Sequence, residues 1–181
     1  SVQVQADDNL LPLLETVVEG SGAEARLNVK WKRWQSIQTR SKVVVTVVVP
    51  KLSAVALKGS GDLQVDAFNT PALKLAISGA GDAEIKDLAT EELVVSLSGS
   101  GNLAGQGKAT KLKVSIAGSG DVRLSDLQSE EVRVSIAGSG EAAVHAQKSL
   151  DVSIAGSGDV SYVGNPTVKS SVAGSGSISK R

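Results

Sequence analysis

Gly118-Ser119-Gly120-Asp121 is one copy of a short motif that occurs seven times in this 181-residue chain. Successive copies begin 20, 20, 19, 20, 18 and 18 residues apart. Self-similarity at such a period indicates a solenoid, in which each repeat packs only on its neighbours. A sharp turn between two strands favours glycine, and the predicted corner glycines are Gly59, Gly61, Gly79, Gly81, Gly99, Gly101, Gly118, Gly120, Gly138, Gly140, Gly156, Gly158, Gly174 and Gly176.

Apolar residues keep fixed positions around each motif. In the fourth copy, Val114 and Ile116 precede the first glycine by four and two residues, and Val122 follows it by four. Residues two apart on a strand share a face, so these side chains point inward and stack on their equivalents in the next coil. Parallel crossovers are nearly always right-handed, and the six-residue aliphatic period of left-handed β-helices is missing. We predict an all-β, right-handed parallel β-helix of about seven coils of 18–20 residues.

Residues 1–50 hold only one motif-like stretch, Gly20-Ser21-Gly22-Ala23, which is either a hairpin turn or a degenerate earlier coil. We expect residues 1–50 to form an N-terminal cap packed on the solenoid of residues 51–181, within one structural domain. The cap is predicted to contain strands and a short helix. The helix, of one or two turns, is expected at Leu10–Glu15, with N-cap side chains from Asp7–Asn9. The predicted strands cover Ser1–Gln5, Thr16–Glu19 and Glu24–Trp31, the last two as a hairpin, and Val43–Val49, expected to be covered on both faces.

Composition excludes several classes of function. The formal net charge is zero, which argues against nucleic acid as a partner. There is no cysteine and His145 is the only histidine, so we expect no zinc site, no cofactor and no Ser–His–acid catalysis. The longest apolar run, Val43–Val49, is too short to span a bilayer.

An acidic ladder follows the second glycine of each motif: Asp62, Asp82, Asn102, Asp121, Glu141, Asp159 and Ser177. One interpretation is a series of calcium sites, because calcium prefers oxygen ligands. The interpretation we favour is structural, with these side chains accepting backbone N–H bonds in the turn.

A strip of small outward residues precedes the corners and is the candidate interface. It includes Ser96, Ser98, Ser115, Ala117, Ser135, Ala137, Ser153 and Ala155. Small side chains permit close approach of another surface, which predicts a homo-oligomer, either a dimer or a trimer, or a partner site. A bare solvated sheet face is the equal alternative.

Trp31 and Trp34, in a stretch rich in lysine and arginine, are candidate ligand contacts for a surface glycan or a protein. The alternative is that Trp31, in phase with Leu27 and Val29, belongs to the core.

The glycine ladder, together with Asp8-Asn9-Leu10-Leu11-Pro12-Leu13-Leu14-Glu15-Thr16, resembles the "head GIN domain" family of putative autotransporter adhesins over nearly the whole chain. The resemblance implies a β-helix in an exported bacterial protein, in the periplasm, anchored to the outer membrane or at the cell surface. Members of that family usually carry a further strand before the position of Ser1 and are often lipoproteins or anchored proteins; whether a signal, an anchor or such a strand once preceded Ser1 is left open by the sequence.

The function expected from these features is that of a non-catalytic extracytoplasmic binding or structural module, adhesin-like and without enzymatic activity. The alternative is a carbohydrate-active β-helix enzyme, a lyase or hydrolase, which rests on analogy of fold. Such an enzyme would need a cleft with two or more convergent carboxylates.

Overall fold

The structure, a computed structural model, describes residues 1–6, 10–20, 25–32 and 43–181. These residues form two compact units, Ser1–Pro50 and Lys51–Arg181, which are described separately. No α-helix occurs in either unit within those described ranges.

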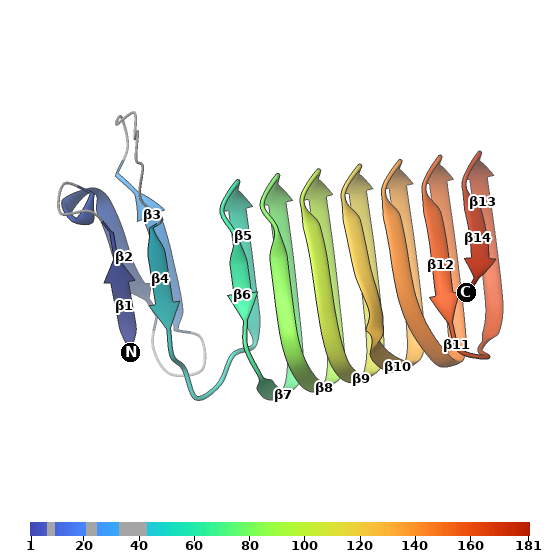
Figure 1. The fold of residues 1–181 in the computed structure, drawn as a ribbon, viewed down its shortest axis with the longest axis horizontal. Coiled ribbons are helices and arrows are strands. Elements are labelled where there is room, and N and C mark those ends of the chain that lie inside the picture. Colours follow the sequence, from blue (N-terminus) through green and yellow to red (C-terminus); the bar gives the residue numbers. More distant parts are fainter. Residues whose placement is uncertain (7–9, 21–24, 33–42) are drawn as a thin grey trace. The chain divides into compact units, whose positions relative to one another are not determined.

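The C-terminal unit is a ladder of parallel strands (Figure 1). Strands β8 to β11 are long because each continues through the bend opposite the glycine corner, where the register with the next coil shifts before pairing resumes. The strands are β5 (Ala54–Gly59), β6 (Leu63–Val65), β7 (Phe68–Gly79), β8 (Ala83–Gly99), β9 (Asn102–Gly118), β10 (Asp121–Gly138), β11 (Glu141–Gly156), β12 (Asp159–Val163), β13 (Thr167–Gly174) and β14 (Ser177–Lys180).

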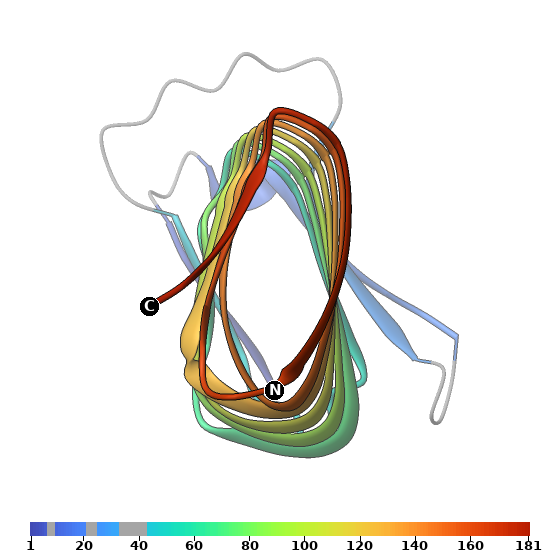
Figure 2. The same cartoon turned by 90° about the vertical axis from the view of Figure 1, so that its right-hand side faces the viewer.

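The register joins equivalent residues of successive coils. Gly138 pairs with Gly118 on one side and with Gly156 on the other, and the same column runs from Gly59 to Gly174. Seen from the C-terminal end, each coil is a flattened oval, and the chain winds in the right-handed sense (Figure 2). The predicted right-handed β-solenoid of about seven turns is therefore confirmed.

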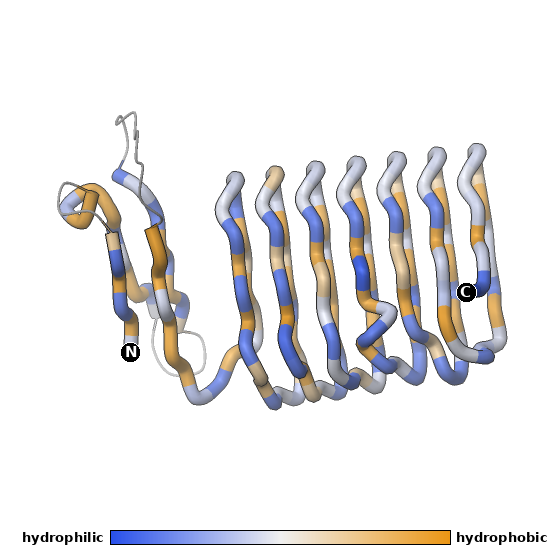
Figure 3. The backbone as a smooth tube through the Cα atoms, viewed as in Figure 1, coloured by the Kyte–Doolittle hydropathy of each residue, from blue (hydrophilic) through white to orange (hydrophobic). Residues whose placement is uncertain are grey.

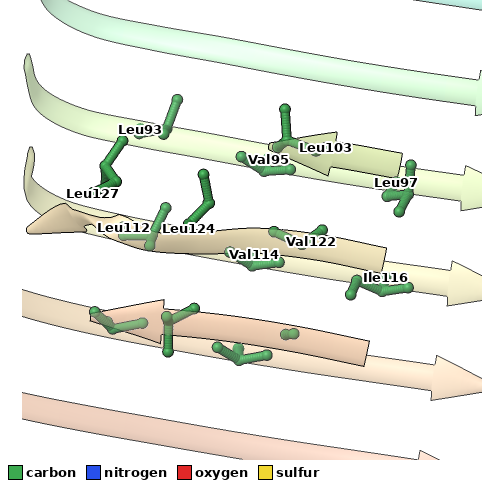
Figure 4. Packing of buried hydrophobic residues seen from close by; sticks show 14 of the residues in the cluster. Leu93, Val95, Leu97, Leu103, Leu112, Val114, Ile116, Val122, Leu124 and Leu127 are labelled. Carbon is green, nitrogen blue, oxygen red and sulfur yellow. The ribbon is translucent and has the colours of Figure 1, made fainter. Parts of the chain in front are cut away.

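The core is a set of aliphatic stacks inside the solenoid, enclosed by the sheet that wraps around it (Figure 4). Val95, Val114 and Val134 form one such stack, and each is 1% exposed or less. The alternation of buried and exposed residues appears as bands of hydropathy along each strand (Figure 3). Burying one such side chain stabilises the fold by about 2 kcal/mol, so neighbouring coils stabilise one another.

The last coil exposes part of its inner side. Val168 and Val172 on β13 are 38% and 42% exposed, whereas Leu150 and Ile154, one coil earlier, are each 1% exposed. Ser170 lies between the two valines, at a position where the preceding coil has Val152. The last described coil therefore presents two partly exposed valines and a serine.

The N-terminal unit contains two antiparallel pairs of strands. Its elements are β1 (Val2–Gln5), the 3-10 helix η1 (Leu11–Leu13), β2 (Leu14–Glu19), β3 (Arg26–Trp31) and β4 (Val44–Val47). Strands β2 and β3 form the predicted hairpin, whose last described pair is Glu19 with Arg26. Strand β1 pairs with β4.

Two expectations for this unit were confirmed only in part. The helix is a single 3-10 turn without a side-chain cap, because Leu14 is already extended and the β-branched residues that follow it favour a strand; Asp7–Asn9 lie outside the described residues. The strand expected over Val43–Val49 is shorter and is not covered on both faces. It belongs to a two-stranded sheet, and Val44, Val47 and Val48 are 41–63% exposed.

Candidate functional site: an outward sheet face and its groove

The candidate interface lies on the outward face of the sheet formed by the strands that lead into the glycine corners. The register aligns Ser115 with Ser96 and Ser135 in one row, and Ala117 with Ser98 and Ala137 in the next. Ser153 and Ala155 extend the two rows on β11. All eight side chains are exposed, while their neighbours along the strands point into the core. The structure therefore brings the eight residues together as a strip two rows wide.

A shallow groove of about 760 Å³ runs beside this strip, and sequence analysis did not predict it. It crosses β8 to β11 and reaches β13, at outward positions five or more residues before each corner. Four acidic and four basic residues line it: Glu91, Glu92, Glu131, Asp151, Lys111, Lys113, Arg133 and Lys169. In the sequence, the groove is marked only by charged residues at these outward positions, and positive and negative charges do not alternate in a regular order.

Ion pairs between neighbouring coils organise the groove. Lys113 Nζ lies 2.7 Å from Glu92 Oε1, and an Arg133 guanidinium nitrogen lies 3.2 Å from an Asp151 carboxylate oxygen. The Lys113 hydrogen bond and charge, aided by Lys111 and Lys74, hold the pKa of Glu92 below its usual value. Glu92 is therefore a carboxylate at neutral pH and a poor proton donor.

Two carboxylates of the acidic ladder link neighbouring coils rather than closing their own turns, whereas Asp121 pairs with Arg123 on its own strand. The Asp82 carboxylate accepts the backbone N–H of Asn102, and the Asp159 carboxylate accepts that of Ser177, in each case one coil later. Within the described ranges, no group of three or more acidic or histidine side chains is arranged to hold a metal ion. Asp82 and Asp159 thus accept hydrogen bonds from the next coil, which supports a structural role for these two carboxylates.

The two glycines of each corner are required for different reasons. Gly118 has a φ of 132°, in the region that favours glycine, and a Cβ there would overlap the carbonyl of Gly99. Gly120 has no such φ, but its Cβ would overlap the Gly101 carbonyl oxygen and lie 2.6 Å from Leu97 Cδ2. Close stacking of coils, rather than backbone conformation, therefore excludes a side chain at Gly120.

The remaining candidates lie elsewhere. Trp31 ends β3, in register with Leu14, and is 38% exposed, so it is not a fully buried core residue. Trp34 lies outside the described residues. His145 is half-buried on β11, in register with Gln128 and Val163.

The C-terminal unit is a right-handed β-solenoid. Its outward sheet face carries the strip and the charged groove, and both are accessible to another molecule. The chain belongs to the family described as "Putative auto-transporter adhesin, head GIN domain", whose pattern matches residues 1–166. The resemblance seen in the sequence is thereby confirmed.

Solved structures share the fold. A putative adhesin from Bacteroides fragilis NCTC 9343 is similar with a TM-score of 0.91 at 24% identity, over 99% of this chain and 82% of that one. A putative lipid binding protein from Parabacteroides distasonis ATCC 8503 has a TM-score of 0.72 at 26% identity, over 99% and 83%. A putative adhesin from the same organism has a TM-score of 0.75 at 22% identity, over 99% and 83%.

Comparison with curated proteins gives no significant match. In the described part of the chain, no helix has the length and apolar character needed to cross a membrane.

Proposed function

We propose that this protein is a non-catalytic, extracytoplasmic binding module with an adhesin-like role at the cell surface. The observation that carries the proposal is the strip of exposed serine and alanine side chains beside the groove, on a sheet whose other face is the aliphatic core. A partner can approach such a face closely without displacing long side chains. Membership in a family described as putative adhesins supports the same role.

The groove supports binding rather than catalysis. A glycoside hydrolase needs two carboxyl groups that flank one bond, one of them with a raised pKa. Here Glu92 has a lowered pKa and is bonded to Lys113, and Asp151 is paired with Arg133. These ion pairs occupy two of the four carboxylates that line the groove.

We also propose that the strip mediates self-association, as a dimer or a trimer. The eight residues lie on four neighbouring strands, β8 to β11, and strands about 4.8 Å apart give the strip a length of about 15 Å. Zero net charge removes long-range repulsion between copies. Closed cyclic symmetry is the common form of homo-oligomers.

The binding proposal is tested by probing the full chain against an array of glycans and extracellular matrix proteins. Ala137→Arg places a long charged side chain in the middle of the strip without touching the core. Ala104→Arg is the matched control. Ala104 is also exposed, but it lies at the start of β9, just after a corner, in register with Arg123 and not with the strip. We expect at least a tenfold loss of binding for the first variant and little change for the second. Equal binding by both variants, or no binding by the unmodified chain, would contradict the proposal.

A further inference from the structure

No further inference is drawn: the strongest candidate, the apolar face of the β2–β3 hairpin that carries Val18, Val29 and Trp31, is an exposed surface, and nothing in the structure shows what covers it.

Discussion

Asn102 donates both its backbone N–H and its side-chain amide to a single carboxylate oxygen of Asp82, at 3.0 and 2.8 Å. The same arrangement recurs at the C-terminal end, where the backbone N–H and the hydroxyl of Ser177 donate to Asp159 at 2.8 and 2.7 Å. One carboxylate therefore ties two coils together at the corner, next to glycines that have no side chain for this purpose.

Removing this carboxylate should weaken the contact between two coils. We expect Asp82→Ala to lower the free energy of unfolding by about 1 kcal/mol, the usual worth of a lost hydrogen bond at a partly solvated site. Urea denaturation gives the measurement. Asp62→Ala is the control, since no bond of this kind joins Asp62 to Asp82 in the described part of the chain. Equal losses in the two variants would show that the bond to Asn102 contributes nothing.

Calcium should leave the stability of the protein unchanged. A ligand that binds only the folded state must raise the melting temperature, whereas the partners of Asp82 and Asp159 are amides and a hydroxyl of the next coil. Thermal melts with chelator and with millimolar calcium should therefore superimpose. A rise of several degrees with calcium would overturn the structural interpretation of the ladder.

A corner glycine should tolerate substitution only where no coil of the solenoid precedes it. Gly120→Ala is expected to cost at least about 2 kcal/mol of unfolding free energy, because its Cβ overlaps the backbone of the preceding coil. Gly61→Ala is the matched control, since the nearest atom to its Cβ is Leu57 Cδ1 at 3.8 Å, an ordinary contact. The denaturation midpoints of the two variants make the comparison. Similar midpoints would mean that the corners are looser than the structure indicates.

The fold could be predicted from the sequence because its determinants repeat. Each coil places aliphatic residues and two glycines at the same offsets. A residue that departs from the pattern in one coil is therefore outweighed by the other coils. The groove could not be predicted, because its outward row holds Lys113, Arg133, Asp151 and Lys169 in successive coils, with no repeating order of charge. The helix is shorter than predicted for a local reason: the β-branched residues after Glu15 favour a strand, and the backbone is already extended at Leu14.

Acid should remove the contribution of the ion pair between Glu92 and Lys113. The pKa of Glu92 is lower in the folded state than its ordinary value. Its stabilising effect is therefore fully present above that ordinary value and is lost as the pH falls through the folded pKa. We expect Glu92→Gln to lower the melting temperature slightly at pH 7 and at low salt, and to leave it unchanged near pH 2. A difference that persists in acid would assign the effect to packing rather than to charge.

Self-association should depend on the strip. A stable interface buries about 800 Å² on each partner. The strip is only two side chains wide, so an interface of that size must extend beyond the strip over more of the outward sheet face. Ala117 and Ala137 are central, in register with each other and exposed. We therefore expect light scattering at tens of micromolar to report a dimer or a trimer for the unmodified chain and a monomer for Ala137→Arg.

Ala104→Arg separates the effect of position from the effect of added charge. It introduces the same side chain at the start of β9, just after a corner and outside the strip. That variant should keep the oligomeric state of the unmodified chain, because its arginine points away from the strip. Dissociation of both variants would indicate that charge alone governs assembly. A monomeric unmodified chain would refute self-association through the strip, and would leave the face exposed for a different partner. The binding array would then decide between a partner site and a bare sheet, because only a partner site loses binding when Ala137 becomes arginine.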